Sequence, residues 1–388
     1  MKRLQILTLP VLAAGILLAG CGDRSNGQTH IIKLGSASPL TGPQAHLGQD
    51  NANGAQLAVD EINAAGGVKL AGKTWQLRLL AEDDQADPKT ATTVAQQLAD
   101  DNVAGVIGHL NSGASIPAAK VYDDAGIPQI SPSSTAIAYT HLGFRTAYRV
   151  MTNDSQQGSA LAQFATHNLH ATRIAVVDDR TAYGQGLADE FARAAKANGA
   201  QIVDREYTTD HSTDFLAILT SIKAQNPDVV FFGGMDPQAG PFARQMRQLG
   251  LNAQLLGGDG METDQFIKLA GEAAAGAVAS NPGLPLDQMP GGEQFRQHFT
   301  TRFGPIQNYA PYAYDAVYVM VDAMKRANSP DPEKYLPMLA STDYRGVTGE
   351  IRFDSHGDLR SGAVTLYQVT HGHWQPITTV SGATPAHH

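Results

Sequence analysis

Two loops rich in hydroxyl groups and glycine are the part of the sequence best suited to hold a small anion. Ser112 and Ser115 follow the apolar run at residues 105–108, and Pro117 is expected in the first turn of a helix. Ser133 and Thr135 follow the next apolar run, at residues 128–131. Backbone N–H groups, hydroxyls and the positive end of a helix dipole all stabilise an anion. We call these loops (residues 109–115 and 131–135) the hydroxyl cradle; the alternative, that their serines only cap helices, stays open.

Residues 67–74 match the phosphate-loop pattern letter by letter, but their setting contradicts it. A phosphate loop lies between a strand and the helix that follows it, so that backbone N–H groups and the helix N-terminus face the phosphates. Here the order is reversed, because a helix is expected to end at Gly66 and Gly67 and a strand to begin at Trp75. We therefore interpret the match as a coincidence.

Acidic clusters and paired histidines do not complete a metal site. A calcium loop needs oxygen ligands at alternating positions and a glycine in register, and the clusters at residues 82–87, 178–179 and 354–358 do not supply both. His371 and His373 lack a third ligand. The sequence has no Gly-x-Ser-x-Gly elbow and no cysteine free to act as a nucleophile. We expect no metal, no cofactor and no enzymatic activity.

The single cysteine, Cys21, indicates an export signal with a lipid anchor. Lys2 and Arg3 precede a mostly apolar run that ends at residue 18, and small residues follow before Cys21. The run is shorter than the roughly 20 residues that a membrane-spanning helix needs. The pattern resembles the bacterial lipobox, in which the cysteine is lipidated and becomes the first residue of the mature protein. A plain secretory signal or an uncleaved anchor remains an alternative.

Composition and charge limit the class of protein. The chain has 388 residues, and removing residues 1–20 leaves enough for two domains of ordinary size. Because that segment contains two basic and no acidic residues, the mature chain has a net charge of −11. A net acidic chain without basic clusters argues against binding to nucleic acid. An apolar content of 42% with 39 glycines is typical of an α/β protein.

The elements that must position the cradle alternate between strand and helix from Ile31 onward, which is typical of βαβ units. In a first series we expect strands at residues 31–37, 75–81, 103–108 and 128–131, and helices at 54–62, 89–100 and about 115–124. This first series is expected to end around residues 144–151. In a second series we expect strands at 173–178, 201–207, 228–233, 254–257 and 276–280, and helices at 184–198, 215–225 and 242–249.

The remaining chain is expected to be helical from 292 to 340 and to end in strands at 349–353, 363–369 and 374–380. Two series of this kind predict an α/β fold with two doubly wound parallel-sheet lobes. Such sheets bind ligands at the carboxyl ends of their strands, so we expect a ligand cleft between the lobes.

With these features in place, the chain resembles the leucine/isoleucine/valine-binding proteins over residues 31–367. The segments that carry the resemblance are 36–43, 60–68, 83–84, 87–88, 106–110 and 130–132 in the first half, and 183–186, 232–234 and 353–358 in the second. The resemblance implies type I periplasmic-binding-protein architecture, with three crossovers and a ligand trapped when two lobes close. It also implies capture of a neutral, branched-chain or other aliphatic amino acid or close analogue, and delivery to an ABC permease.

The resemblance assigns roles to individual residues. The ligand carboxylate is expected to bind Ser112, Thr135 and groups near Ser133, without a basic residue. The ligand ammonium is expected to bind Asp259 and Tyr183 of the second lobe. Asp259 stands where the family often has a glutamate, which is one methylene longer.

Other positions line the expected side-chain pocket or depart from the family pattern. Leu47, Met235 and Tyr309 are expected to line the pocket, and the first two replace aromatic residues that are common in the family. The family's usual disulfide joins positions that here are Ala86 and Asn111.

From these assignments we expect a signal at residues 1–20, a tether at 21–30, a first lobe at 31–150 with 283–353, and a second lobe at 151–282 with 354–380. The expected partners are an amino acid ligand, an ABC permease in the inner membrane and a membrane reached through the lipid anchor, with the protein itself a monomer in the cell envelope. An alternative is a ligand sensor of the same fold that reports to a signalling partner.

Overall fold

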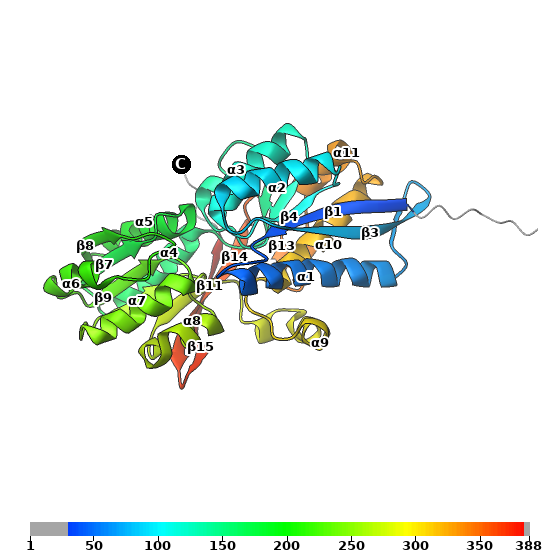
Figure 1. Ribbon diagram of the computed structural model, residues 1–388. Helices are drawn as coiled ribbons and strands as arrows, with labels where there is room; N and C mark the ends of the chain where they lie inside the picture. Colours follow the sequence, from blue (N-terminus) through cyan, green and yellow to red (C-terminus); the bar gives the residue numbers. More distant parts are fainter. Residues whose placement is uncertain (1–29, 384–388) are drawn as a thin grey trace, which may run out of the picture.

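A computed structural model describes residues 30–383 as two α/β lobes side by side (Figure 1). The signal, Cys21 and most of the tether lie outside the described residues. One lobe contains β1, β3, β4 and α1–α3, and the other contains β7–β9 and α4–α8 (Figure 1). The predicted fold class, two lobes with largely parallel sheets, is confirmed.

The first lobe is built on a six-stranded sheet with the order β2-β3-β1-β4-β5-β6. All neighbours are parallel except β2 and β3, which form an antiparallel pair. Its strands are β1 (His30–Ser38), β2 (Val68–Leu70), β3 (Lys73–Asp83), β4 (Val106–Gly108), β5 (Gln129–Ser131) and β6 (Ala147–Arg149). Because β4 and β5 are adjacent and parallel, the two cradle loops leave the sheet at the same edge.

The second lobe is built on a seven-stranded sheet with the order β15-β14-β11-β10-β9-β7-β8. Its parallel strands are β7 (Arg173–Asp178), β8 (Gln201–Tyr207), β9 (Val229–Gly233), β10 (Gln254–Gly257) and β11 (Val278–Pro282). The last strands of the chain, β14 (Ser361–Thr370) and β15 (His373–Ala383), add to it in antiparallel fashion. A small separate pair is formed by β12 (Tyr344–Arg345) and β13 (Glu350–Ile351).

Helices cover both sheets. The first lobe has α1 (Ala45–Ala64), α2 (Pro88–Asp100), α3 (Ser112–Asp124), α9 (Gly292–Phe303), α10 (Ala310–Ala327) and α11 (Pro332–Ala340). The second has α4 (Asp154–Gln163), α5 (Ala182–Ala197), α6 (Leu216–Ala224), α7 (Asp236–Gln248) and α8 (Asp264–Ala270). Within residues 30–383, no helix is both long and apolar enough to cross a bilayer.

Two helices begin earlier than the sequence pattern predicts. The helix predicted at residues 54–62 starts at Ala45, and α3 starts at Ser112 rather than near Ser115. Pro117 therefore lies inside α3 and not in its first turn. The start of α3 is fixed by Asn111, whose extended backbone precedes the helix and whose carbonyl accepts the N–H groups of residues 114 and 115.

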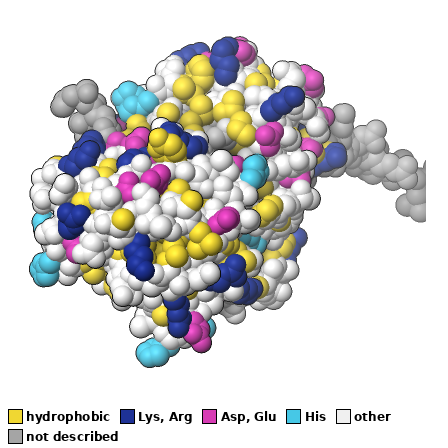
Figure 2. Space-filling model, turned by 60° about the vertical axis from the view of Figure 1, so that its left-hand side comes forward, with side chains coloured by type: hydrophobic (Ala, Val, Ile, Leu, Met, Phe, Trp, Pro, Cys, Tyr) yellow, Lys and Arg dark blue, Asp and Glu magenta, His cyan; other side chains and the backbone are white. Residues whose placement is uncertain are grey.

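The coincidental phosphate-loop match spans β2, a tight turn and the start of β3, and no helix follows it. Within residues 30–383, no group of three potential ligands could hold a metal ion. Figure 2 shows basic and acidic side chains interspersed over one face of the molecule, without a basic patch.

Candidate ligand site between the lobes

The hydroxyl cradle forms at the carboxyl ends of β4 and β5, where serine side chains join its two loops. The Ser131 hydroxyl donates to the carbonyl of His109 at 2.8 Å. Ser133 and Ser134 both donate to the carbonyl of Leu110, at 3.2 and 3.0 Å. Most of these hydroxyls therefore hold the loops together, and none of the three caps a helix.

Ser112 and Thr135 keep hydrogen-bonding capacity that the loops do not use. The Ser112 oxygen accepts the N–H of Ala136 at 3.2 Å, which leaves its own hydrogen available. The Thr135 hydroxyl is buried and makes no hydrogen bond of ordinary geometry with any described residue. The first N–H groups of α3 also lack partners within the helix. This part of the cradle can donate several hydrogen bonds to one carboxylate.

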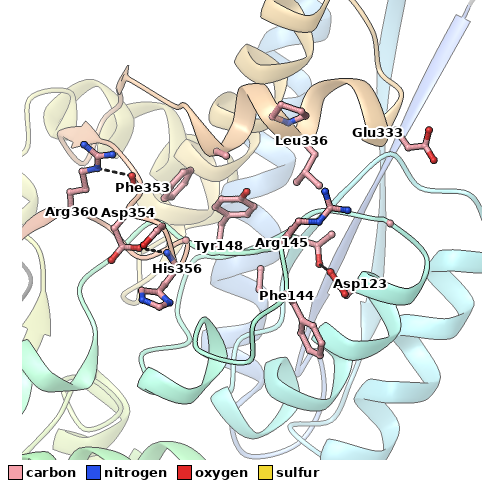
Figure 3. A pocket seen from close by; sticks show the side chains of 17 residues that line it. Asp123, Phe144, Arg145, Tyr148, Glu333, Leu336, Phe353, Asp354, His356 and Arg360 are labelled. Carbon is pink, nitrogen blue, oxygen red and sulfur yellow. Dashed lines mark hydrogen bonds between the residues drawn. The ribbon is translucent and has the colours of Figure 1, made fainter. Parts of the chain in front are cut away.

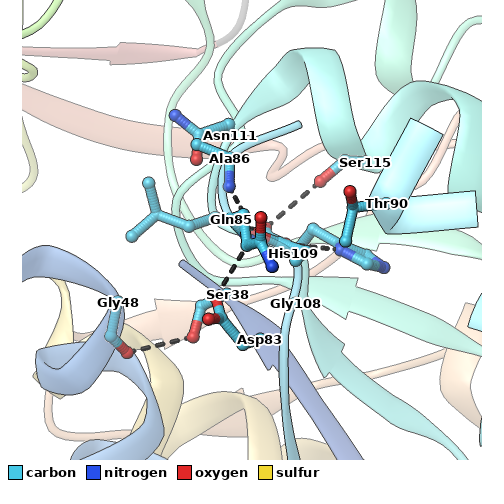
Figure 4. A network of polar contacts seen from close by, with 12 residues as sticks. Ser38, Gly48, Asp83, Gln85, Ala86, Thr90, Gly108, His109, Asn111 and Ser115 are labelled. Carbon is cyan, nitrogen blue, oxygen red and sulfur yellow. Dashed lines mark hydrogen bonds and ion pairs between the residues drawn. The ribbon is translucent and has the colours of Figure 1, made fainter. Parts of the chain in front are cut away.

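A buried network under the first loop fixes its position. The His109 ring bonds to a carboxylate oxygen of Asp84 at 2.7 Å and to the Tyr122 hydroxyl at 3.1 Å. The His109 carbonyl accepts the Ser115 hydroxyl at 3.1 Å (Figure 4). Since all of these side chains are buried, the loop between β4 and α3 is held rigidly from below.

Arg149 lies behind the cradle, which the sequence interpretation missed. Its guanidinium is fully buried and donates to the carbonyls of Ser134 and Ala136, at 2.7 and 2.9 Å. Its charge is paired with Asp358 at 2.5 Å. The cradle was expected to lack a basic residue; an arginine does support its second loop, although Asp358 neutralises that charge.

On the other lobe, Asp259 follows β10 and accepts hydrogen bonds from three side chains. Gln157 and Tyr183 donate to one carboxylate oxygen at 2.8 and 3.0 Å, and Tyr309 donates to the other at 2.7 Å. Burial raises the pKa of Asp259, and the three hydrogen bonds oppose that rise. A carboxylate can accept about four hydrogen bonds, so Asp259 keeps one site for a ligand.

The predicted pocket residues Leu47, Met235 and Tyr309 are all buried in one apolar cluster that also contains Tyr183. Met235 and Tyr183 pack on either side of the turn after Asp259. A Cβ at Gly260 would lie 2.5 Å from the Met235 sulfur and 3.0 Å from the Tyr183 ring, so only glycine fits there.

Helix α1 connects this apolar cluster to the cradle. Asn51 donates from its side chain to the Ser133 hydroxyl at 3.0 Å. Leu47 lies one turn earlier on the same face of α1, because residues four apart share a face of a helix. Leu47 is therefore placed beside the cradle, with its side chain fully buried.

The lobes contact each other around these residues. Besides the bond from Tyr309 to Asp259, the Asn308 amide donates to the Asp259 carbonyl at 3.2 Å. At the edge of α1, His46 bonds to Asp236 of α7 at 2.8 Å. A cavity of about 110 Å³ remains at the rim between the lobes. Tyr309 of the first lobe and Asp259 and Tyr183 of the second thus meet where the lobes touch.

A larger cavity, of about 790 Å³, lies elsewhere and contains none of the predicted site residues (Figure 3). Phe144, Tyr148 and Phe353 line it together with Arg145 and Arg360. It is open to solvent beside α11, and β6 separates it from the cradle: Tyr148 lines it, whereas the neighbouring Arg149 donates to the cradle carbonyls.

Gln157 is a second residue that the sequence interpretation missed. It lies on α4, a helix that the periodicity of apolar residues did not indicate. The available signal was the capping box: the Asn153 side chain accepts from the backbone at the start of α4, and Gln156 accepts the Asn153 N–H in return. The Gln157 amide oxygen accepts the Ser280 hydroxyl at 2.6 Å, so Gln157 links α4 to β11 beside Asp259.

Two α/β lobes that meet around a buried polar interior define a two-lobed ligand-binding protein. Residues 31–373 match the family model described as periplasmic binding protein, and the chain belongs to that family. It is 34% identical over 358 residues to the Leu/Ile/Val-binding protein homolog 1 of Brucella abortus, which covers 92% of this chain and 95% of the relative. It is 32% identical to the leucine-, isoleucine-, valine-, threonine- and alanine-binding protein of Pseudomonas aeruginosa, with 92% and 94% covered.

Solved structures agree with these relatives. A leucine binding protein from Thermotoga maritima superposes with a TM-score of 0.84 at 28% identity, covering 90% of this chain and 98% of the other. A branched-chain amino acid transporter substrate binding protein from Streptococcus pneumoniae, solved with isoleucine, gives 0.82 at 28% identity, covering 91% and 100%. The resemblance to the Leu/Ile/Val-binding proteins is confirmed, and the chain is a solute-binding protein rather than an enzyme.

Proposed function

We propose that this protein is an extracytoplasmic, lipid-anchored binding protein that captures a neutral, branched-chain amino acid and delivers it to an ABC permease. The relatives bind such amino acids, and the names of the solved structures connect them to ABC transporters. A family of periplasmic binding proteins also fits the export signal in the sequence. In this proposal the protein acts as a monomer, with residues 31–150 and 283–353 as one lobe and 151–282 and 354–380 as the other.

The observation that carries the proposal is the opposite chemistry of the two sides of the closed interior. Ser112 and Thr135 offer hydroxyl donors on the first lobe, with the N–H groups at the start of α3 beside them. Asp259 offers a carboxylate on the second lobe, with Tyr183 next to it. A zwitterion has a carboxylate and an ammonium at one end, so it fits between these groups.

The ligand side chain is assigned to the apolar part of the interior. Leu47 and Met235 are aliphatic and buried, and Tyr309 contributes a ring whose hydroxyl is already bonded to Asp259. Apolar contact without a further polar partner favours an aliphatic side chain over a polar one, because a polar group buried without a partner costs about 1–3 kcal/mol. Leucine, isoleucine and valine have this chemistry.

Calorimetric titration of the purified protein with L-leucine, L-isoleucine and L-valine tests the proposal. We expect binding of at least one of them, and binding of 4-methylpentanoate, which is leucine without its amino group, at least about ten-fold weaker because Asp259 would lose its partner. No binding of the three amino acids, or equal affinity for leucine and 4-methylpentanoate, would contradict it.

Variants of the cradle test the carboxylate contacts. Ser112→Ala and Thr135→Val should each weaken leucine binding about ten- to hundred-fold, since a hydrogen bond to a charged group contributes about 1.5–3 kcal/mol. Thr365→Val is the matched control. Thr365 is equally buried, but it lies on β14 of the second sheet and its hydroxyl donates to the Gly283 carbonyl. Wild-type affinity in both cradle variants would reject the assignment.

A further inference from the structure

A cavity of about 470 Å³ lies where the chain passes between the two lobes, and we call it the hinge cavity. Within residues 30–383, three connecting segments make this passage: 150–153 between β6 and α4, 283–291 between β11 and α9, and 352–360 between β13 and β14. All three contribute to the wall of the cavity, through Val150–Thr152, through Gly283 and Leu284, and through Leu359. None of the predicted ligand residues lines it, so the hinge cavity is separate from the candidate ligand site.

Two of the connecting segments share one hydrogen-bond acceptor at the edge of this cavity. The Ala363 carbonyl of β14 accepts the Gly283 N–H at 2.6 Å and the Thr152 hydroxyl at 3.4 Å. The packing around this point is tight. A Cβ at Gly283 would lie 1.9 Å from the Tyr312 hydroxyl, and one at Gly362 would lie 2.4 Å from the Thr152 methyl group. The segments are therefore fixed against each other and against α10.

The shape of the hinge cavity depends on the angle between the lobes. Its wall includes Tyr312 of α10 and Ile351 of β13, and on the other side Ala363 of the second sheet. When two lobes rotate relative to each other, the backbone angles of the segments that join them absorb the change. Since these segments form the wall, the cavity has its present shape only in the arrangement in which Tyr309 bonds to Asp259 across the lobes.

The wall of the hinge cavity is mostly apolar. Its larger apolar side chains are those of Val150, Met151, Leu284, Ile351 and Leu359. The Thr348 hydroxyl donates to the Asp315 carboxylate at 2.6 Å, and the Tyr312 hydroxyl donates to a backbone carbonyl at 2.5 Å. Among the described residues that line the cavity, Glu350 is the one charged side chain, and it is exposed and paired with Arg352 at 2.8 Å. A cavity of this size without a free counter-charge fits a small neutral molecule with an apolar body.

The larger cavity beside α11 does not have these properties. Of the three connecting segments, it is lined by 352–360 alone, and Arg145, Arg360 and Glu333 give its wall charges of both signs. A molecule bound there would not contact all the connections between the lobes.

We propose that the hinge cavity is a regulatory site for a small, neutral, mainly apolar molecule, and that this molecule raises the affinity for the amino acid ligand. A molecule that fits the present shape stabilises this arrangement of the lobes over arrangements with another lobe angle. The amino acid binds between the lobes and favours the same arrangement, so the coupling rests on the proposed function, whereas the site itself does not. By linkage, each ligand raises the affinity for the other by the same factor.

The first test uses the wild-type protein and 1-octanol as the probe, because octanol has an apolar chain and no charge. Titration calorimetry should show that octanol binds and that saturating octanol raises the leucine affinity at least about five-fold. Saturating leucine should raise the octanol affinity by the same factor. Octanoate and octylammonium have the same chain with a charge, and should bind at least about ten-fold more weakly than octanol.

Three results of this test would overturn the proposal. One is the absence of octanol binding, and another is a leucine affinity that saturating octanol leaves unchanged or lowers. A lowered leucine affinity would place octanol in the amino acid site instead of the hinge cavity. The third is equal affinity for octanol and its charged analogues, which contradicts a neutral ligand.

The second test locates the bound octanol. Leu284→Trp fills the cavity with a larger side chain, so octanol should bind at least about ten-fold more weakly and lose its effect on leucine. Leu249→Trp is the matched control, because Leu249 is also partly buried but follows α7, away from the connecting segments. It should keep the full octanol effect. Ser381→Trp, at the exposed rim of the cavity, replaces Leu284→Trp if the thermal transition shows that the latter is unfolded. An unchanged octanol effect in the folded variant would reject this location.

The outcomes separate this inference from the proposed function. If the wild type binds leucine and octanol does not change that affinity, only the role of the hinge cavity is wrong. If the wild type binds none of leucine, isoleucine and valine, the proposed function is wrong. Octanol binding by the wild type, and its loss in Leu284→Trp, would still support the site, and the absence of octanol binding would reject it as well.

Discussion

At the scale of single residues, the ion pair between Arg149 and Asp358 joins the cradle to a distant part of the sequence. Arg149 ends β6 and holds two carbonyls of the second cradle loop, whereas Asp358 lies more than 200 positions later, in the segment that leads to β14. Burial alone would raise the pKa of Asp358. Arg149 and the hydroxyl of Thr140 outweigh this effect, so the pKa of Asp358 lies below its ordinary value. The pair is therefore charged at neutral pH and stabilises the loop that carries Thr135.

We predict that Asp358→Asn lowers the free energy of unfolding at pH 7 by about 3–5 kcal/mol, because it leaves a buried guanidinium without its counterion. A carboxyl group whose pKa is lower in the folded state contributes stability above its unfolded pKa of about 3.9, and that contribution is lost as the pH falls through the folded pKa. The difference between wild type and variant should therefore shrink below about pH 4. Urea unfolding at pH 7 and pH 3.5 measures it, and a difference that grows in acid would contradict the assignment.

This pair also shows a limit of sequence interpretation at the residue scale. The hydroxyl residues of the cradle could be predicted, because they follow two apolar runs that had to be neighbouring strands. Arg149 and Asp358 could not be paired, since nothing in either local sequence indicates that the segment between β13 and β14 passes behind the cradle. Only the three-dimensional path of the chain brings them within 2.5 Å.

At the scale of elements, α1 positions the start of α10. The Asp50 carboxylate of α1 accepts the backbone N–H groups of four consecutive residues, from 307 to 310, at 2.8 to 3.0 Å. Tyr309 is the N-cap and Ala310 the first residue of α10, so the carboxylate binds the segment that leads into the helix and also complements the helix dipole. Tyr309, which bonds to Asp259 across the interior, is among the residues held.

Asp50→Asn should therefore affect both stability and binding. We expect a loss of about 2 kcal/mol in the free energy of unfolding, because hydrogen bonds to a charged group are replaced by weaker ones. Leucine binding should also weaken, since Tyr309 loses its anchor. The matched control is Asp331→Asn, at the exposed start of α11, which should cost less than about 1 kcal/mol and leave binding unchanged. Chemical denaturation and calorimetry measure the two effects; equal effects in the two variants would contradict this role of α1.

Elements were predictable where apolar spacing determines them. The strands predicted at 173–178, 201–207 and 254–257 have the predicted bounds, because each is a compact apolar or alternating run. Helix α4 was not predicted, because its buried face consists of small and polar residues such as Gly158 and Ala160. A Cβ at Gly158 would lie 2.7 Å from the backbone of Phe191, so close packing on α5 replaces an apolar stripe. Since Gln157 lies on α4, missing this helix also removed Gln157 from the predicted site.

At the scale of the whole molecule, the export signal and the ligand site lie in separate parts of the chain. The binding residues lie within residues 30–383, and Cys21 precedes them. We predict that Cys21→Ala removes the protein from the membrane fraction of cells, because the thiol that would be lipidated is absent, or leaves it as an unprocessed precursor. Cell fractionation with detergent extraction measures this. Membrane association of a variant whose signal has been removed would contradict the lipid anchor.

The contact between His46 and Asp236 joins the two lobes. His46 lies on α1 of the first lobe and bonds at 2.8 Å to a carboxylate on α7 of the second, which also accepts the Thr263 hydroxyl at 2.6 Å. A contact that exists only when the lobes are closed shifts the equilibrium toward the closed state by its own free energy. It should therefore slow the release of ligand without touching the ligand.

We predict that His46→Gln weakens leucine binding about three- to ten-fold, mainly through faster dissociation, because a hydrogen bond to a charged group contributes on the order of 1 kcal/mol at a half-buried position. Stopped-flow measurement of association and dissociation separates the two rates. His298→Gln is the matched control, since His298 bonds to Glu61 at 2.7 Å within the first lobe and should leave both rates unchanged. Small-angle scattering should show compaction of the wild type at saturating leucine. At one subsaturating leucine concentration used for both proteins, His46→Gln should be less compact than the wild type. If the variant releases leucine at the wild-type rate, the contact does not stabilise closure, and the bond from Tyr309 to Asp259 remains to hold the lobes together.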